Sequence, residues 1–351
     1  MNTRTISNII KISATYAGTI MGAGFASGQE LTQFFVVYGS MGLAGLLITC
    51  CLFSWLGIQI LEISYKIKAT SYHELLYYVC GKKIGLCLDM MITAFLFGVL
   101  TVMLAGAGTL FQDTFNLSYS LGLGIMSFGL ITTLLCGLKG ITTANIIITP
   151  LLTVTIIIIA LYSLYHHQIN LGMLTLPAQT TALPAPHWLL ASFLYLSYNL
   201  IMSAAVLVPL GARITQRKSR IWGSIAGALL LMILAGLITI VVLIHYPESV
   251  EQEIPMLFIA HSQHTLHHAS YIFIFLASIY TTGLASLYGC ATKLTAVTHL
   301  STINSLFILV ALSLILSYIG FANLIAILFP LFGYSTLWFT CKLLYLSFFP
   351  R

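Results

Sequence analysis

Long stretches without a charged residue recur along the whole chain and decide what it folds into. A helix that crosses a lipid bilayer needs roughly 20 consecutive, mostly apolar residues. Backbone groups in lipid have no water to bond, and uninterrupted apolar runs of this length favour helices over a barrel. The sequence therefore predicts an all-α integral membrane protein with about ten transmembrane helices. The predicted helices span residues 9–38, 41–65, 86–112, 119–137, 143–165, 188–211, 221–246, 269–291, 302–318 and 321–341.

Composition leaves little of the 351-residue chain outside the bilayer. Hydrophobic residues make up 59% of it and charged residues 6%, a balance that a water-soluble domain of this size does not carry. We therefore expect one transmembrane domain, residues 1–351, with the lipid bilayer as its solvent. The net charge of +6 does not indicate nucleic acid, because the basic residues form small clusters at helix ends rather than one stripe.

The basic residues also predict the orientation. With the N-terminus in the cytoplasm, all 14 Lys and Arg fall at the inner ends of the predicted helices, as the positive-inside rule requires. Adding or losing one helix would destroy this segregation, so it supports the helix number as well. We expect a multi-pass protein of the cytoplasmic membrane with both termini inside.

One predicted outer loop, residues 261–268, is rich in histidine. On a helix, His261, His264 and His268 would share one face, which is one interpretation in favour of a metal site. A solvated polar loop is the favoured interpretation, because no cysteine or nearby carboxylate completes a ligand set.

The first predicted helix is rich in glycine halfway through its span. This centre reads Gly22-Ala23-Gly24-Phe25-Ala26-Ser27-Gly28, and glycine releases the backbone from helical geometry. Irregular backbone at that depth is tolerated only where it is buried in protein or lines a cavity. Broken helices near the bilayer midplane are typical of transporter substrate sites. Close helix packing through small residues is the alternative, and Gly24 and Gly28 have the spacing for it.

Ser27 and Glu30 shift the balance toward a break. Ser-x-x-Glu is the pattern of a capping box, which marks a helix start, so we predict an inner half-helix ending near Gly22 and an outer half-helix beginning near Ser27. Glu30 is the only carboxylate deep in a predicted span, and burying its charge is costly. Two roles stay open for it: a capping bond to the Ser27 N–H, or direct binding of a cation, a substrate amine or a proton.

Polar side chains also lie at mid-depth in the sixth and eighth predicted helices. The sixth contains Tyr198, Asn199 and Ser203, and Asn199 offers both a donor and an acceptor. A packing bond between helices is the alternative for Asn199, and the segment lacks glycine. The eighth contains Thr281 and Thr282, whose hydroxyl oxygens suit a small hard cation, although membrane threonines also bond back to their own backbone.

A weak internal repeat relates the two halves of the chain. Residues 106–111 resemble residues 283–288, and the same offset carries Gly22 onto Asn199. We expect two five-helix halves, residues 9–165 and 188–341. An odd number of helices gives the halves opposite topology, as inverted-repeat transporters require.

The glycine-rich segment continues into Gln33-Phe34-Phe35 and Tyr38-Gly39. Together with residues 195–200 and 255–257, these residues resemble the YkvI-type bacterial membrane proteins. The resemblance implies the amino acid–polyamine–organocation (APC) superfamily, a bacterial inner membrane, and a LeuT-like fold. In that fold, two inverted five-helix repeats place broken first and sixth helices around the substrate.

The resemblance also implies a coupling ion. In sodium-coupled relatives, carbonyls of the first-helix break and paired hydroxyls on the eighth helix hold the cation, at positions matched here by Gly22, Phe25, Thr281 and Thr282. Some proton-coupled relatives carry a lysine in the fifth helix. The predicted fifth helix, residues 143–165, has none. Sodium is therefore favoured, while Glu30 keeps protons open.

These features predict an ion-coupled secondary transporter, a symporter that moves an amino acid or related small amine by alternating access. The alternatives are a sensor built on a transporter fold and a transporter of an organic cation or nucleobase-like compound. A channel is less favoured, because neither a ring of charges nor a carbonyl filter is visible. An enzyme would need converging acids, bases or metal ligands, so we expect no catalysis and no cofactor besides a coupling sodium ion.

The sequence does not indicate an oligomeric state. The expected substrate-binding residues are Gly22, Ala23, Gly24, Phe25, Ala26, Ser27, Gly28, Glu30, Tyr198, Asn199 and Ser203.

Overall fold

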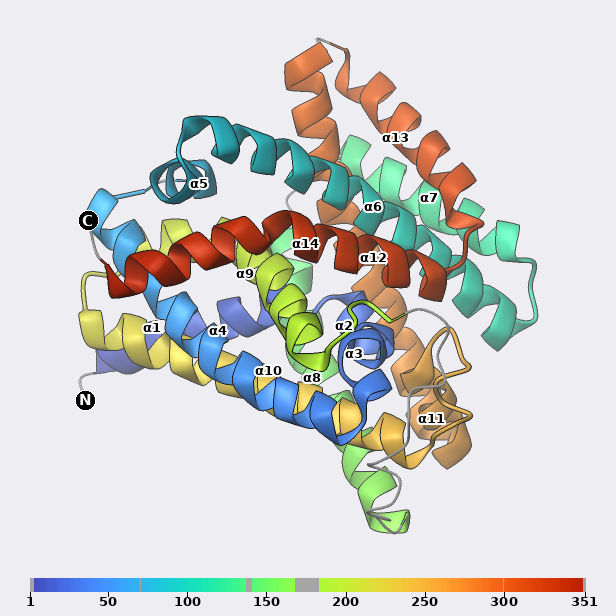
Figure 1. The fold of residues 1–351 in the computed structure, drawn as a ribbon. Helices are drawn as coiled ribbons and strands as arrows, with labels where there is room; N and C mark the ends of the chain where they lie inside the picture. Colours follow the sequence, from blue (N-terminus) through green and yellow to red (C-terminus); the bar gives the residue numbers. More distant parts are fainter. Residues whose placement is uncertain (1–2, 70, 137–140, 168–182, 299, 350–351) are drawn as a thin grey trace.

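The computed structural model describes residues 3–69, 71–136, 141–167, 183–298 and 300–349, and most of them are helical (Figure 1). Within these ranges no residue is in a β-strand, which confirms the predicted all-α class. In chain order the elements are α1 (Thr3–Ile20), α2 (Ala23–Ser27), α3 (Gln29–Phe34), the 3-10 turn η1 (Val36–Tyr38), α4 (Ser40–Ile67), α5 (Tyr72–Cys80), α6 (Lys82–Phe115), α7 (Tyr119–Cys136), α8 (Ile141–His166), α9 (Trp188–Arg213), α10 (Arg217–Ile244), α11 (Pro255–Gln263), α12 (Thr265–Thr298), α13 (Thr302–Ser317) and α14 (Phe321–Phe348).

Seven of the helices in the described ranges are long and apolar enough to cross a membrane by length and composition. These are α4, α6, α8, α9, α10, α12 and α14. Two shorter apolar helices, α7 and α13, match two further predicted spans, and the first predicted span is divided among α1, α2, α3 and η1. Apart from the interruptions in the first span, the predicted spans are helical in nearly all of their described residues, with ends that differ by several residues.

Two short helices, α5 and α11, were not predicted. Each has nine residues, too few to cross a bilayer. A search for long apolar runs passes over them because α5 mixes polar and apolar residues and α11 follows an acidic loop. α11 begins with a proline, a residue that suits the first helical position because its missing N–H would have no partner there.

The predicted break in the sixth helix is wrong. α9 runs as one helix from Trp188 to Arg213. The segment has no glycine before Gly211, and the Asn199 side chain bonds back to the Tyr195 carbonyl 3.1 Å away, one turn earlier in the same helix. Pro209 lies near the end of α9, far from Asn199. Polar residues at mid-depth alone do not interrupt a helix whose backbone groups stay paired.

The helices pack as two groups. α4 packs against α9 and α10, and α1 packs against the same two helices. These four helices form the first group, called here the bundle. α6, α7, α12 and α13 form the second group, called the scaffold, and α14 lies across both through α9 and α6 (Figure 1). The short helices α2 and α3 contact α12 of the scaffold, α9 and α10 of the bundle, and α14. The glycine-rich segment therefore lies where the two groups meet.

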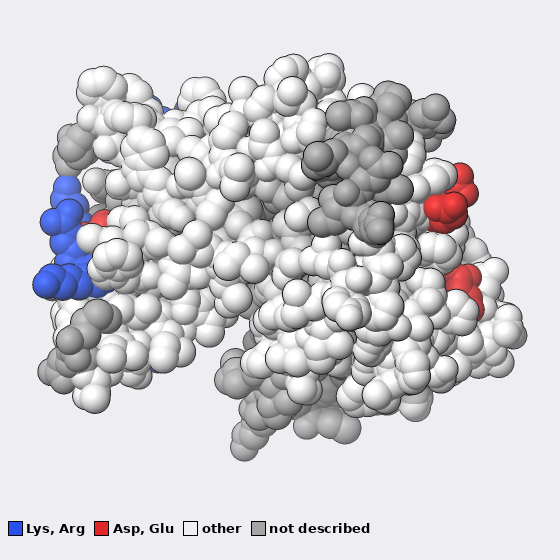
Figure 2. Space-filling model, turned by 90° about the horizontal axis from the view of Figure 1, so that it is seen from below, with Lys and Arg blue, Asp and Glu red and all other residues white. Residues whose placement is uncertain are grey.

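Charge is segregated between the two ends of the molecule. Both termini lie at one end (Figure 1), and Figure 2 shows Lys and Arg gathered at that end with acidic residues at the other. Two basic residues, Lys139 and Arg351, fall outside the described residues. The arrangement of the remaining basic residues agrees with the predicted asymmetry, which the positive-inside rule connects to orientation.

This asymmetry predicts which surface residues face the outside of the cell. In a background without native cysteines, Ser40→Cys and Ser262→Cys should react with a membrane-impermeant thiol reagent added to intact cells, since both positions are exposed at the acidic end. Thr215→Cys, exposed at the basic end, should react only after the cells are opened. Labelling of Thr215→Cys in intact cells would reverse the orientation.

Candidate functional site

The first membrane segment is interrupted twice. α1 ends at Ile20, and α2 begins at Ala23 after Gly22, which has extended backbone angles (φ −81°, ψ −175°). α2 ends at Ser27, and the φ of 80° at the following Gly28 lies in the left-handed region that only glycine adopts without strain. A side chain at Gly28 would also come within 3.0 Å of Met256. The predicted inner end near Gly22 is confirmed, whereas the outer part begins at Ala23 and bends again at Gly28.

Neighbouring side chains satisfy the carbonyl groups released by these interruptions. The Ser27 hydroxyl donates to the Gly24 carbonyl at 2.7 Å. The Gly28 carbonyl accepts the Thr32 N–H at 2.8 Å, and the Thr32 hydroxyl adds a second bond at 2.9 Å. Tyr271 of α12 reaches across from the scaffold and donates to the Ala26 carbonyl at 2.6 Å. The sequence analysis missed Tyr271, because a tyrosine in an apolar helix does not reveal which carbonyl it bonds.

The predicted capping box between Ser27 and Glu30 is absent from this described segment. α3 begins at Gln29 with Gly28 as its N-cap, and the Ser27 hydroxyl accepts from the Gln29 N–H at 3.1 Å. The left-handed turn at Gly28 moves the helix start by two residues and directs the Glu30 side chain elsewhere. The capping bond, one of the two roles left open for Glu30, is therefore not formed. Direct binding of a cation, a substrate amine or a proton stays a prediction.

Glu30 bonds to two of the predicted site residues on α9. Tyr198 donates its hydroxyl to Glu30 Oε1, and the Asn199 Nδ2 lies 3.5 Å from the same oxygen. All three residues are buried. No ion pair found among the described residues involves Glu30. Ser203, one turn further along α9, is buried and donates to the Leu200 carbonyl of its own helix.

Aromatic rings surround the contact between Glu30 and Tyr198. The Tyr198 ring centroid lies 5.4 Å from that of Phe329 on α14, 5.6 Å from that of Phe34 on α3 and 6.1 Å from that of Phe95 on α6. Sequence analysis did not assign these phenylalanines to the site, because an apolar aromatic residue in a membrane helix has no pattern that separates it from the core. Their arrangement gives the carboxyl an apolar, water-poor setting.

Gly24 fits closely against the Glu30 carboxyl. A Cβ atom at Gly24 would lie 2.8 Å from Glu30 Oε2 and 3.6 Å from Phe329 Cζ. The space beside Gly24 is thus taken by the carboxyl itself. A larger residue at Gly24 would push Glu30 away from Tyr198.

The four residues expected around a cation are brought together only in part. The nearest atom to a Cβ built on Gly22 is Thr282 Oγ1, at 3.9 Å, so the first interruption and α12 do meet. The Thr281 hydroxyl donates to the carbonyls of Ala277 and Ser278 on its own helix, which leaves its oxygen able to accept. The Gly22 and Phe25 carbonyls already accept backbone N–H groups, at 2.9 and 3.1 Å. A cation here would share these oxygens.

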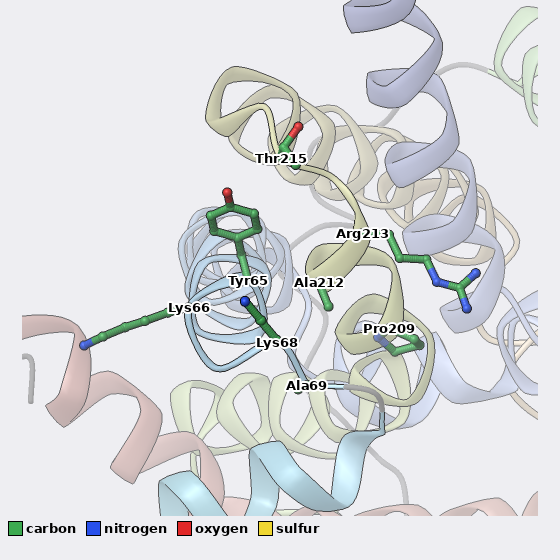
Figure 3. Close-up of a pocket in the computed structure, with 8 residues that line it drawn as sticks. All are labelled: Tyr65, Lys66, Lys68, Ala69, Pro209, Ala212, Arg213 and Thr215. Atoms are coloured by element: carbon green, nitrogen blue, oxygen red, sulfur yellow. The ribbon is translucent and has the colours of Figure 1, made fainter.

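Two hollows in the described part of the chain lie away from Glu30. One is lined by α7 and α12 residues with an almost wholly apolar surface, including Phe273 and Tyr280. The other, of about 530 Å³, lies at the basic end where α4 and α9 finish, and Figure 3 shows Lys66, Lys68 and Arg213 around it. Neither hollow contains a predicted substrate-binding residue.

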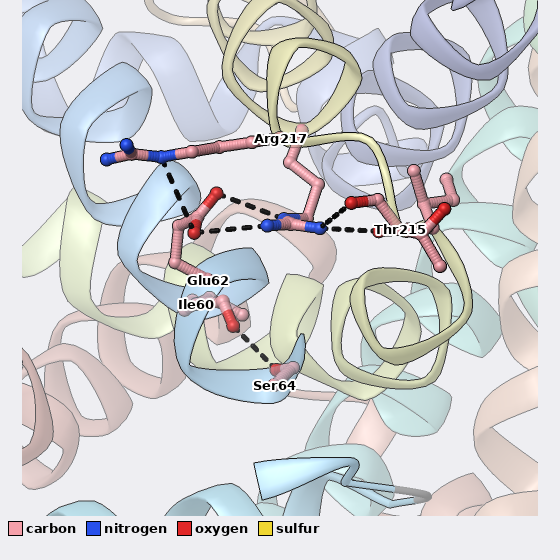
Figure 4. A network of polar contacts seen from close by, with 7 residues as sticks. Ile60, Glu62, Ser64, Thr215 and Arg217 are labelled. Atoms are coloured by element: carbon pink, nitrogen blue, oxygen red, sulfur yellow. Dashed lines mark hydrogen bonds and ion pairs between the residues drawn. The ribbon is translucent and has the colours of Figure 1, made fainter. Parts of the chain in front are cut away.

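The carboxyls near the basic end, the half-buried Glu62 and the buried Asp89, are paired with basic side chains. Glu62 of α4 accepts from Arg220 Nε at 3.0 Å and Nη2 at 3.2 Å, and Arg217 Nε lies 3.8 Å away (Figure 4). Asp89 of α6 is bonded by Lys293 of α12 and by two side chains of α5, Tyr72 and His73. Glu30 differs from both carboxyls, because its hydrogen-bond donors are a tyrosine hydroxyl and an amide rather than basic side chains.

The outer histidines do not form the shared helical face that was one interpretation of them. The favoured interpretation, a polar loop, is also wrong, because residues 261–263 and 265–268 are helical. α11 ends at Gln263 and α12 starts at Thr265, so His264 lies between two helices. His261 Nδ1 and His268 Nδ1 are 3.4 Å apart. Within the described residues, no group of three or more potential ligands could hold a metal ion.

Relatives from Bacillus subtilis (strain 168) match nearly the whole chain. The uncharacterized membrane protein YkvI is 30% identical over 339 residues, which cover 95% of this chain and 94% of the relative. The uncharacterized protein YyaD is 30% identical over 342 residues, covering 93% of this chain and 94% of the relative. No family model matches the chain.

Solved structures share the fold. MhsT in complex with L-phenylalanine has a TM-score of 0.61 and 16% identity, covering 93% of this chain and 87% of its own. The inward-facing form of Mhp1 has a TM-score of 0.59 and 14% identity, covering 88% and 69%. A Na⁺-coupled sialic acid symporter has a TM-score of 0.51 and 14% identity, covering 93% and 81%. The fold is the LeuT-like fold of these proteins.

Gly24 and Gly22 form a matched pair for testing the Glu30 contact. Gly24→Ala should lower the free energy of unfolding by about 1–3 kcal/mol, since the added methyl group displaces a carboxyl that two residues of α9 hold in place. Gly22→Ala meets no atom closer than 3.9 Å and should cost at most about 1 kcal/mol. Thermal unfolding of both purified variants measures the difference, and equal stability of the two would contradict the geometry at Gly24.

Arg220 and Arg217 provide a second pair, at the basic end. Arg220 is buried and binds Glu62 together with the Ile214 and Thr215 carbonyls, so Arg220→Ala should destabilise the protein by about 2–3 kcal/mol. Arg217→Ala removes an exposed partner at 3.8 Å and should cost less than about 0.5 kcal/mol. The same unfolding measurement applies, and a larger loss for Arg217→Ala would mean that the Arg220 contacts do not hold α4, α9 and α10 together.

Proposed function

Because the chain belongs to the family of the membrane protein YkvI, we propose that it is an ion-coupled secondary transporter of the bacterial cytoplasmic membrane. It moves an amino acid or related small amine by alternating access. Its helices form two inverted five-helix repeats, and both termini face the cytoplasm. The observation that carries the proposal is the buried Glu30 carboxyl, on an interrupted helix between the bundle and the scaffold.

The amine group of the substrate binds Glu30. A buried carboxylate without a cation is costly, and the contacts to Glu30 among the described residues come from Tyr198 and Asn199. A substrate ammonium group supplies the missing charge. The rings of Phe34, Tyr198 and Phe329 surround this position, and aromatic faces attract cations. Substrate enters in a conformation in which α3 and α14 move apart.

Sodium is the proposed coupling ion, at the meeting point of Gly22, Phe25, Thr281 and Thr282. The approach of Gly22 to Thr282 supports this assignment, as does the fold shared with a Na⁺-coupled symporter. A hard monovalent cation is bound by several neutral oxygens, which unwound carbonyls and hydroxyls supply in transporters of this kind. The alternative coupling ion is a proton carried by Glu30.

The names of the structural relatives point to more than one substrate class. MhsT was solved with L-phenylalanine, and Mhp1 is described as a nucleobase-cation-symport-1 family transporter. A nucleobase-like compound would use the Tyr198 and Asn199 hydrogen bonds and the aromatic rings, without needing a charge on Glu30. An organic cation would use the carboxylate and the rings. A thermal-shift screen of the purified protein against amino acids, amines and nucleobases separates these classes, because a ligand stabilises the state it binds.

Sodium coupling and proton coupling lead to different effects on the affinity of the ligand found in that screen. With sodium coupling, Thr281→Val combined with Thr282→Val should remove the sodium dependence of ligand affinity, a loss of at least about fivefold at high sodium. Glu30→Gln should weaken amine binding at every sodium concentration while keeping that dependence. With proton coupling, the unmutated protein responds to pH and not to sodium, and Glu30→Gln abolishes the response.

The measurement is ligand affinity across a sodium series at two pH values. Thr292→Val is the matched control, because Thr292 lies on the same helix, is exposed and bonds only to its own turn among the described contacts. It should behave as the unmutated protein does. If ligand affinity in the unmutated protein does not change with sodium concentration, the sodium assignment is wrong. Ligand binding without ion-driven uptake in liposomes would favour the sensor.

A further inference from the structure

The hollow at the basic end is a pocket formed where two membrane-spanning helices finish. Its walls come from the end of α4, with Tyr65, Lys66, Lys68 and Ala69, and from the end of α9, with Arg213 and the following Thr215. Its volume is about 530 Å³, and the exposed side chains of Tyr65, Lys68 and Thr215 show that it opens at the surface.

The lining of this pocket is strongly cationic. Lys66, Lys68 and Arg213 contribute three positive charges, and no carboxylate is among the lining residues. Glu62 lies one turn from Lys66 on α4, but Arg220 and Arg217 bind it. The C-terminal ends of two helices each contribute about −0.5 charge, which together is less than the positive charge of the lining side chains.

Contacts behind the pocket hold its walls in place. The Arg220 guanidinium lies 4.1 Å from the Tyr65 ring centroid, and it donates to the Ile214 and Thr215 carbonyls at 2.6 and 3.1 Å. The carbonyls at the end of α9 are therefore bonded and do not turn into the pocket. At the end of α4, the N–H groups of Lys68 and Ala69 bond to the preceding turn. The backbone of both walls is fixed, while the exposed Lys68 and Arg213 side chains are long enough to adjust.

We propose that this pocket binds the phosphate headgroup of an anionic phospholipid. Figure 3 shows Lys66 and Arg213 extending to opposite sides of the pocket with Lys68 between them. Lys68 and Arg213 are exposed, and exposed side chains of this length rotate readily, so both are able to turn toward a phosphate. Basic pockets between the cytoplasmic ends of membrane helices recognise anionic headgroups through this chemistry.

The surroundings of the pocket favour a lipid over a soluble phosphate. Pro209 and Ala212 on α9 and Ala69 provide an apolar surface beside the cations. Tyr65 is 38% exposed, and tyrosine is enriched at the level of the headgroups, where one end of its ring is wet and the other apolar. A soluble phosphate would gain nothing from this apolar wall, whereas the glycerol and upper acyl carbons of a phospholipid would lie along it.

A titration of the purified full chain in neutral detergent tests the proposal. Short-chain phosphatidylglycerol is added in one series and phosphatidylcholine in a second, and native mass spectrometry measures bound lipid. Phosphatidylglycerol should bind more tightly than phosphatidylcholine. Each basic side chain at an anionic lipid surface changes affinity about fivefold, so Lys68→Gln combined with Arg213→Gln should weaken phosphatidylglycerol binding about 25-fold. Thr215→Asp, which adds a repelling carboxylate without removing a lysine, should weaken it too.

The control removes the same charge elsewhere at the same end. Lys82→Gln combined with Lys83→Gln alters two exposed lysines at the start of α6, outside the pocket, and should leave binding within about twofold of the unmutated protein. Equal weakening by both double variants, or equal binding of the two lipids, would overturn the pocket as a lipid site. A third series with inorganic phosphate at constant ionic strength distinguishes the source. Phosphate binding as tight as that of the lipid, and lost in the Lys68 and Arg213 variant, would replace the lipid with a soluble anion.

Discussion

Polar backbone released inside a membrane must find partners in the protein, and this constraint shapes the centre of the molecule. The interruptions at Gly22 and Gly28 free carbonyl groups that water cannot reach. Ser27 and Tyr271 bond to the Gly24 and Ala26 carbonyls of this segment. Because Tyr271 lies on α12, the interrupted segment of the first membrane helix is tied to the scaffold as well as to the bundle. The substrate site proposed here exists because this irregular segment has partners on both sides.

The distribution of charge follows from the same cost. Asp89 and Glu62 are carboxylates near the basic end, and each is bonded by basic side chains from neighbouring helices. Such pairs hold helices together without leaving a bare charge in a medium of low polarity. Glu30 lies among aromatic rings and is bonded by a hydroxyl and an amide instead. A binding site for a mobile cation needs a carboxylate without a fixed basic partner. A carboxylate already paired with a lysine or arginine has no charge left to attract a substrate.

The sequence predicted the membrane helices and the interrupted first segment because both depend on local features. Apolar length sets the spans, and Gly22 and Gly28 mark the interruptions. The prediction failed where contacts between residues far apart in the sequence determine the backbone conformation. Ser27 and Glu30 have the spacing of a capping box, yet Met256 and Ile238 surround Gly28, and its left-handed turn starts the helix later. The predicted break in the sixth helix came from the family resemblance and not from local residues. α9 has no glycine before Gly211, and its Asn199 bonds to Tyr195 and Glu30. The contributions of Phe95, Phe329 and Tyr271 require knowledge of which helices are neighbours, and local pattern does not contain it.

The contact between Glu30 and α9 also shows how binding and conformation can be linked. An ionised Glu30 accepts hydrogen bonds from both Tyr198 and Asn199, whereas a protonated carboxyl carries a hydrogen of its own and has less capacity to accept. A substrate ammonium group likewise competes with Tyr198 and Asn199 for the carboxylate oxygens. Either event weakens the connection between α3 and the bundle at the position where bundle and scaffold meet. A ligand shifts a conformational equilibrium only by the difference in its affinity for the two states, and a carboxyl that exchanges protein donors for a ligand provides such a difference at Glu30.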